Sequence, residues 1–179
     1  MSSFLEVSDL VFSYQVKNFE PIKQTIMSQI GEMEVRPYKS TTSQIYNTDY
    51  HIQIDSERPQ DIYRPYLETV GPLIRQHSEF MAEQVDCDEY VVSNCWFQQY
   101  RQDDHHSVHV HPHCMFSNIL YVEFPSNSSR TTFYYKDGEY EFPVDEGTII
   151  TFPSFFKHES KPNKSSQKTI ISYNSSIVR

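Results

Sequence analysis

The chain has 179 residues, which suits a single domain or a domain with a sizeable N-terminal extension. Its net charge of −9 and the absence of a Lys/Arg cluster argue against a nucleic-acid-binding surface. No apolar run could span a bilayer and the N-terminus has no signal-peptide pattern, so we expect no membrane association and a cytoplasmic location.

The aromatic and cysteine contents narrow the class of protein further. Aromatic residues reach 15% of the chain, so Tyr and Phe must build much of the core. Cys87, Cys95 and Cys114 are odd in number and lack the C-x-x-C spacing, which argues against a disulfide framework. We expect them to be free thiols in a reducing compartment.

The N-terminal part of the chain begins with an apolar stretch, residues 4–16, that is typical of a strand or an extended lead-in. Residues 18–30 carry apolar side chains at intervals of three or four and are predicted to form a helix. Asn18 is placed to cap this helix, Pro21 falls in its first turn, and Gly31 is placed to end it.

The next stretch, residues 36–54, is polar and has no clear period, so we predict a loop with one short strand. A second helix is predicted to begin near Pro59 or Pro65 and to run to Gln84. Pro72 should kink or divide this helix, because proline removes a backbone donor and its ring clashes with the preceding turn.

The C-terminal part is rich in aromatic and β-branched residues, the composition of strands. Asp137-Gly138 is a strong signal for a hairpin turn. The predicted strands cover residues 90–100, 108–111, 117–124, 131–136, 139–142, 148–152 and 168–178. Short strands separated by turns suggest a sandwich or barrel. We therefore expect one mainly β domain, with residues 1–88 as a supporting region and residues 89–179 as its core.

A histidine cluster is the strongest chemical feature of the sequence. Five of the eight histidines fall between His105 and His113. His109 and His111 are two apart in a predicted strand, so their imidazoles point to the same face and can hold a transition metal together. His158, which follows the segment GTIITFPSFFKH, is the candidate for a third ligand. Three protein ligands leave coordination positions open, as catalysis requires.

The other histidines are assigned to different roles. His105 and His106 follow two aspartates and are expected to be solvated. His113 lies beyond Pro112, which discourages continuation of the strand, so we expect it near the entrance of the site. The His-x-Glu motif at His77 lies in a predicted helix, where residues two apart do not face each other, and is rejected as a metal site.

Three segments carry a specific resemblance: CWFQQYRQDDHHSVHVHPHCMFSNILYVEFP, EGTIITFPSFFKHESKPN and KTIISYN. Their motifs and order resemble those of the 2-oxoglutarate- and iron(II)-dependent oxygenases of bacteria and phages, over roughly the C-terminal half of the chain. This resemblance implies a double-stranded β-helix (a cupin-like jelly roll) with N-terminal helices packed on one sheet. It also implies Fe(II), 2-oxoglutarate and O₂ as partners, in the cytoplasm of a bacterium or of a phage-infected host cell.

Carried over residue by residue, the resemblance makes His109, His111 and His158 the iron ligands. Lys168 stands where the family has an arginine that pairs with the distal carboxylate of 2-oxoglutarate. Strand alternation puts Lys168 on the same face as Ser172, so a lysine that faces inward needs an anion partner. Lysine is a point charge where arginine offers a bidentate fork.

Other residues near these motifs are candidates for binding the cosubstrate. Tyr121 and Asn118 could donate hydrogen bonds to it, and Ser172 keeps the second serine of the family's last strand. Asn118 departs from a family glycine and leaves less room near the metal. Trp96 and Gln98 are expected to line the cavity floor.

The resemblance implies oxidative decarboxylation of 2-oxoglutarate coupled to C–H hydroxylation of a peptide or a small molecule. Two alternatives stay open. One is a cupin-type three-histidine iron oxygenase that does not use 2-oxoglutarate, and the other is a non-catalytic jelly roll whose metal only stabilises the fold. Lys168 distinguishes the two kinds of enzyme, because its removal should abolish only turnover that depends on 2-oxoglutarate.

Overall fold

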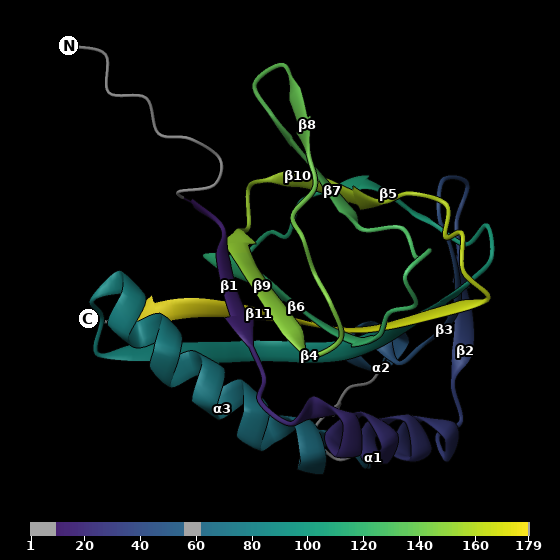
Figure 1. Cartoon of the computed structure of the whole chain (residues 1–179), viewed down its shortest axis with the longest axis horizontal. Coiled ribbons are helices and arrows are strands. Elements are labelled where there is room, and N and C mark those ends of the chain that lie inside the picture. Colours follow the sequence, from purple (N-terminus) through teal and green to yellow (C-terminus); the bar gives the residue numbers. More distant parts are fainter. Residues whose placement is uncertain (1–9, 56–61, 179) are drawn as a thin grey trace.

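The computed structural model describes residues 10–55 and 62–178 and contains two antiparallel β-sheets that face each other (Figure 1). The larger sheet has, in spatial order, β1 (Phe12–Gln15), β9 (Thr148–Pro153), β6 (Phe116–Glu123), β11 (Gln167–Val178), β4 (Glu89–Arg101), β3 (Gln44–Thr48) and β2 (Arg36–Lys39). The smaller sheet has β5 (His106–His109), β10 (Lys157–Ser160), β7 (Thr131–Tyr135) and β8 (Gly138–Tyr140).

Two helices, α1 (Phe19–Gly31) and α3 (Tyr66–Val85), cover the outer face of the larger sheet (Figure 1). A short helix, α2 (Tyr50–Asp55), connects β3 to the segment before α3. In the part of the chain that the structure describes, no helix is long and apolar enough to cross a membrane. The prediction of a mainly β jelly roll with N-terminal helices on one sheet is confirmed.

The larger sheet has a separate apolar core on each face. Alternation along β11 sends Ile171 and Tyr173 toward α1 and α3, where they join residues such as Ile26 and Val70. The other face packs against the smaller sheet through a second cluster, which includes Tyr100, Ile119, Tyr121, Phe133, Phe152 and Ile170. Lys168 and Ser172 share the alternation of Ile170 and therefore point between the sheets.

The helix ends differ from the predicted caps. Asn18 precedes α1 in a left-handed conformation (φ 51°) and its side chain makes no capping hydrogen bond. Gly31 is the last helical residue, and Glu32 follows it in the right-handed region, so Gly31 is not a left-handed cap. α3 begins after Pro65 and continues through Pro72, which lies on the exposed side of the helix. Water can reach the carbonyl that loses its partner there, so Pro72 does not divide the helix.

Residues 36–54 were predicted as loop with one strand, but form two strands and the start of α2. β3 pairs with the C-terminal part of β4, with Asn47 opposite Gln99. The pairing comes from a strand far along the chain, which a local period does not reveal. Residues 4–9 of the predicted first strand, and Pro59, lie outside the described residues, while residues 12–15 pair with β9.

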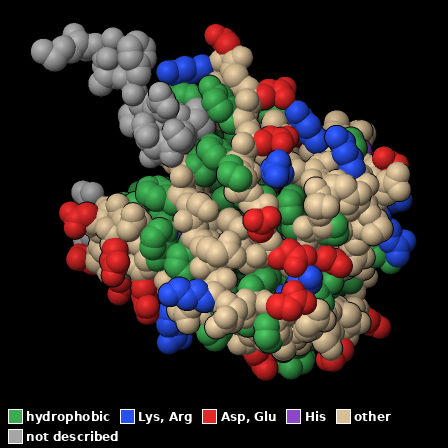
Figure 2. All heavy atoms as spheres, viewed as in Figure 1, with side chains coloured by type: hydrophobic (Ala, Val, Ile, Leu, Met, Phe, Trp, Pro, Cys, Tyr) green, Lys and Arg blue, Asp and Glu red, His purple; other side chains and the backbone are tan. Residues whose placement is uncertain are grey.

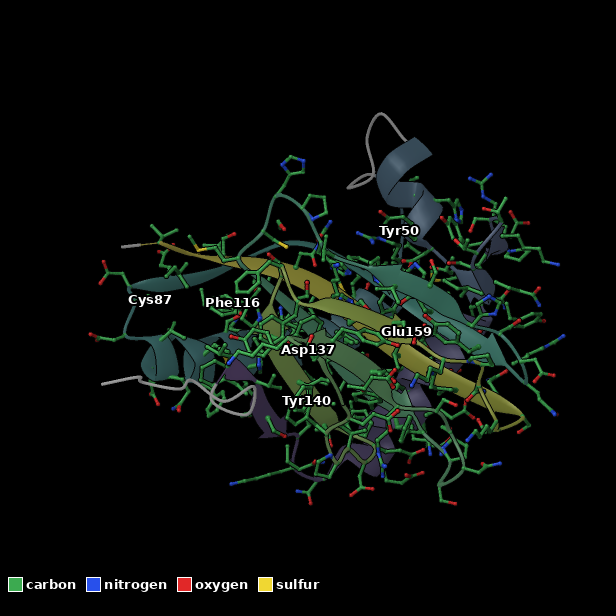
Figure 3. The ribbon with its side chains drawn as sticks, turned by 90° about the horizontal axis from the view of Figure 1, so that it is seen from above. Tyr50, Cys87, Phe116, Asp137, Tyr140 and Glu159 are labelled. Carbon is green, nitrogen blue, oxygen red and sulfur yellow. The ribbon has the colours of Figure 1, made fainter. Side chains whose placement is uncertain are left out.

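Two details of the smaller sheet also correct the predictions. β5 ends at His109, so His111 lies two residues beyond the strand instead of inside it. The β7–β8 turn consists of Lys136 and Asp137, because Tyr135 pairs with Gly138 and Lys136 has the positive φ of 53°. Asp137 and Tyr140 mark this hairpin in Figure 3.

The surface carries both signs of charge. Figure 2 shows acidic and basic side chains interspersed over one face of the molecule, with apolar side chains between them.

Candidate metal centre

Three histidines meet at the edge of the smaller sheet. His109 ends β5 and is paired directly with His158 on the neighbouring strand β10. His111 reaches the same place from beyond β5, where its backbone N–H donates to the Ser154 carbonyl oxygen at 3.1 Å. One ring nitrogen from each histidine lies within 4.8 Å of the others, so the three can hold a single ion.

The tautomer of each of these histidines follows from its hydrogen bond. In every case Nδ1 faces a carbonyl-type oxygen that can only accept, so Nδ1 carries the proton. The Nε2 lone pair is then free for a metal, the arrangement of a ligating imidazole held by a second hydrogen bond. The pairs are His109 with Ser107 O at 2.7 Å, His111 with Asn174 Oδ1 at 2.7 Å and His158 with Phe156 O at 2.9 Å.

Burial keeps these imidazoles uncharged. It lowers the pKa of His109 to about 4 and that of His111 below its ordinary value, and it lowers the pKa of His158 well below 6.5. Phe152 packs edge-on against His158, with ring centroids 4.8 Å apart. All three side chains are therefore in the neutral, metal-binding form at pH 7.

His106 was predicted to be solvated, and that prediction is wrong. Its ring stacks on His109 with centroids 4.0 Å apart and an interplanar angle of 27°, and burial lowers its pKa to about 3. The tertiary pairing of β5 turns it inward. His105 is half-buried beside it, and His113 is exposed at the rim of the cleft in front of the site, where it was expected.

Lys168 is buried between the sheets, with 1% of its surface exposed. Its ammonium group donates to Ser160 Oγ at 2.7 Å and to the Ser129 carbonyl oxygen at 2.9 Å, and lies 4.5 Å from the centroid of the Tyr100 ring. No carboxylate pairs with it among the described residues. Burial without an anion lowers its pKa to about 7.

A small cavity of about 30 Å³ is lined by the three histidines and by Tyr100 and Ser160, the two side chains that contact the Lys168 ammonium group. Its walls include Ser160 and Thr131, two hydroxyl side chains that the sequence reasoning missed. Ser160 could have been found, because it lies two residues after His158 on the same face of a strand, but residues 157–160 were not recognised as a strand. Thr131 is opposite Ser160 in the pairing of β7 with β10.

The remaining predicted cosubstrate residues divide between the two faces of the larger sheet. Ser172 lines the small cavity, and Tyr121 points to the same side and bonds the Thr131 hydroxyl at 2.9 Å. Asn118 points to the opposite face, toward α3.

The amide of Asn118 is fully buried and fully used. Its Oδ1 accepts from Tyr90 OH at 3.0 Å and Thr151 Oγ1 at 2.6 Å, and its Nδ2 donates to Tyr173 O at 3.0 Å and Ser175 Oγ at 2.9 Å. The prediction that it binds the cosubstrate is therefore wrong.

A larger cleft of about 570 Å³ opens in front of His109 and His111. Trp96 and Gln98 line both this cleft and the small cavity, as predicted. Tyr50, which Figure 3 labels beside α2, packs against Trp96 with ring centroids 5.2 Å apart. Another hollow of about 680 Å³ lies beside Met33 and is lined by none of the three candidate ligands.

Comparisons with known proteins agree on the fold. No family model and no curated protein matches the chain. A 2OG-Fe(II) oxygenase family oxidoreductase from Burkholderia pseudomallei superposes with a TM-score of 0.71, at 16% identity over 91% of this chain and 84% of that one.

Two further solved structures are similar. The viral collagen prolyl hydroxylase of Paramecium bursaria Chlorella virus 1 gives a TM-score of 0.66, at 12% identity over 95% of this chain and 97% of that one. A non-heme α-ketoglutarate-dependent epimerase from nogalamycin biosynthesis gives a TM-score of 0.64, at 10% identity over 92% of this chain and 76% of that one. The chain thus shares its jelly-roll fold with 2OG-Fe(II) oxygenases, as its motifs predicted, and carries a three-histidine metal-site candidate on that fold.

Proposed function

We propose that this protein is an oxygenase that depends on Fe(II) and 2-oxoglutarate. The observation that carries the proposal is the histidine triad: three neutral imidazoles on adjacent segments, one buried and two half-buried, each with Nδ1 bonded to an oxygen and Nε2 free. Imidazole nitrogens suit Fe(II), and three of them leave coordination positions open for a chelating cosubstrate. His109, His111 and His158 would be the ligands.

Fe(II) with 2-oxoglutarate bound there would supply O₂ activation and oxidative decarboxylation, leading to C–H hydroxylation of a substrate. The protein supplies the rest: three ligands of fixed tautomer, a dry wall formed by Phe133 and Phe152, and a cation. Because the three ligands are neutral, they leave the metal with its full +2 charge, and a dianionic cosubstrate compensates that charge.

Lys168 would bind the distal carboxylate of 2-oxoglutarate. A buried ammonium without an anion is unfavourable, and a carboxylate would restore its ordinary charged state. Ser160 holds the Lys168 ammonium group and lines the cavity that leads to the histidines, which favours this direction of binding. Ser172 borders the same space, and Tyr121 bonds to Thr131 in its wall. Because the cavity measures only about 30 Å³, binding must move the groups around it, and exchange of the Ser129 backbone carbonyl for a carboxylate at Lys168 is one such movement.

The substrate would enter the cleft in front of His109 and His111. The cleft has a volume of about 570 Å³, which suits a small molecule or a few residues of a peptide. The structural neighbours include both a collagen prolyl hydroxylase and an epimerase from nogalamycin biosynthesis, so a peptide and a small molecule are both consistent with the fold.

A second candidate is a three-histidine iron oxygenase that does not use 2-oxoglutarate. The observation that favours it is that Lys168 already has two oxygen partners and a small cavity beside it. In such an enzyme Lys168 would be structural.

The test is aerobic incubation with Fe(II), 2-oxoglutarate and a panel of candidate substrates, followed by measurement of succinate. The expected result is succinate from the wild type and none from His158→Ala. Equal yields from the two proteins would overturn the proposal. Lys168→Ala then separates the candidates, because it abolishes turnover only if 2-oxoglutarate is the cosubstrate.

A further inference from the structure

Three carboxamide side chains line the cleft next to the histidine triad, and Asn94 is half-buried while the other two, Gln98 and Asn174, are buried. Gln98 and Asn174 come from the adjacent strands β4 and β11, on the face that looks between the sheets. Both are almost completely buried, with 5% and 8% of their surfaces exposed. Buried amides normally have all of their polar atoms bonded, so their partners indicate what each amide can still do.

The orientation of each amide is set by its oxygen. Asn174 Oδ1 accepts from His111 Nδ1 at 2.7 Å and from Ser117 Oγ at 3.3 Å. Gln98 Oε1 accepts from Ser172 Oγ at 3.3 Å. With the oxygens used in this way, the NH₂ groups must point away from these partners.

Neither NH₂ group bonds to another of the described residues, yet neither is sealed inside the protein. Among those residues, Arg64 Nε is the only enclosed side-chain nitrogen or oxygen without a partner. Asn174 lines only the cleft, so its Nδ2 is open to the cleft, while Gln98 lines both the cleft and the small cavity, so its Nε2 is open to the space in front of the histidines that these two hollows share. The two NH₂ groups form two donors of fixed direction beside the candidate metal centre.

The rest of the cleft wall offers no acidic or basic partner to a charged ligand. None of its lining side chains is Lys, Arg, Asp or Glu, and its aromatic members include Tyr38, Tyr50 and Trp96. A carboxylate or an ammonium group that entered would lose water without gaining an ionic partner from the protein. A neutral carbonyl oxygen would instead accept from the waiting N–H groups.

We propose that Gln98 and Asn174 determine substrate specificity, selecting an uncharged substrate whose carbonyl oxygens accept hydrogen bonds from these amides. The aromatic side chains of the cleft contact the apolar part of the same substrate. The inference rests on the proposed function, because the cleft is the substrate side only if the triad holds the reacting metal.

The experiment uses the full, metal-free chain and three small probes of nearly the same size. N-acetyl-leucine N-methylamide is neutral, N-acetyl-leucine is an anion and leucine N-methylamide is a cation. Binding is followed by the fluorescence of Trp96, the sole tryptophan, and by the side-chain amide NMR signals of Gln98 and Asn174. We expect the neutral probe to bind about fivefold or more tightly than either charged one, and to shift both amide signals.

Gln98→Leu should weaken binding of the neutral probe by about fivefold, the effect of one lost hydrogen bond. Gln99→Leu is the matched control, because Gln99 is the next residue of β4, faces away from the cleft and bonds Thr169. Native melting of both variants excludes misfolding.

Equal binding of the three probes, no binding of any of them, or equal effects of the two variants would overturn the inference. Succinate formation is not measured, so a failure here is separate from a failure of the proposed oxygenase activity.

Discussion

Lys168 lies in surroundings that do not favour a charged side chain. It is enclosed between two sheets, with two neutral oxygens and an aromatic ring as partners, and burial lowers its pKa to about 7. A strongly perturbed ionisable group beside a cavity marks a candidate functional site.

Replacement of this cation tests its role. Lys168→Met keeps the apolar stem and removes the charge, so we expect an unchanged fold and unchanged metal binding. The affinity for 2-oxoglutarate should fall by about tenfold to a hundredfold, the effect of one lost charge-assisted hydrogen bond. Isothermal titration with 2-oxoglutarate on the metal-loaded protein measures it. An unaltered affinity would favour the enzyme that does not use 2-oxoglutarate.

Each histidine of the triad has one hydrogen-bond partner at Nδ1. Asn174 is the only one of these three partners that is a side chain, since the other two are backbone carbonyls. Asn174→Leu removes the oxygen that orients His111. We expect the affinity for Co(II) to fall by about tenfold to a hundredfold, as for other outer partners of metal ligands. Titration of Co(II) against the tryptophan fluorescence measures it, with Ser93→Ala at the rim of the cleft as the control. Loss of affinity in the control alone would contradict the assignment.

At this scale the sequence predicted that His109, His111 and His158 lie together, but not all of their neighbours. The His-x-His spacing and the motif around His158 were sufficient to bring the triad together. Asn118 was assigned wrongly because alternation turns it away from Ile119, which faces the metal side, and a one-residue offset changes the face. His106 was missed because its burial depends on strands that are distant in the sequence.

Among the elements, α3 is attached to the larger sheet by a buried histidine. His77 donates from Nε2 to Thr151 Oγ1 at 3.0 Å, because that hydroxyl already donates to Asn118, and its Nδ1 accepts from Tyr173 OH at 2.8 Å. Burial lowers the pKa of His77 to about 4. The histidine therefore stays neutral in the folded protein over a range in which the unfolded chain takes up a proton.

The consequence is a dependence of stability on pH. Between pH 6.5 and pH 4 the unfolded state binds the extra proton, so the free energy of unfolding falls as the pH falls. When the pH falls from 7.5 to 5, His77 alone should lower the free energy of unfolding by about 2 kcal/mol. Urea unfolding at both values measures it. His77→Gln should reduce the loss, while His51→Gln on α2 should not, and equal losses in wild type and His77→Gln would contradict the assignment.

Strands whose composition is typical of strands were predicted well. Strands with polar sequences, which form by pairing with distant segments, were not. The aromatic, β-branched stretches gave β4, β6, β9 and β11 nearly in place. Only one short strand was predicted where β2 and β3 lie, and β10 was missed, because these sequences are polar and their strand form depends on partners far along the chain. The hairpin β2–β3 is also held against β5, where Ser43 Oγ accepts from the Ser107 N–H at 3.0 Å. A sequence pattern does not show this contact.

At the scale of the whole molecule, the candidate metal centre joins the two sheets. His109 and His158 belong to the smaller sheet, and His111 is bonded to Asn174 of the larger one. An ion bound by all three would therefore connect both layers, in addition to the apolar contacts between them.

Metal binding should stabilise the fold for this reason. An ion at about a hundred times its dissociation constant adds about 2.7 kcal/mol, which for a chain of this length raises Tm by roughly 5–10 °C. Differential scanning calorimetry with Co(II) measures the shift, and EDTA should reverse it. The double variant His109→Ala/His158→Ala should show none. A similar shift in that variant would mean that the ion binds elsewhere.

Binding of Fe(II) by the triad is tested most directly by an anaerobic titration with Fe(II) followed through Trp96, whose ring lies 5.8 Å from that of His111. We predict quenching that saturates at about one equivalent in the wild type and is lost in His158→Ala. Quenching of equal size and stoichiometry in His158→Ala would contradict the assignment of His109, His111 and His158 as one iron site.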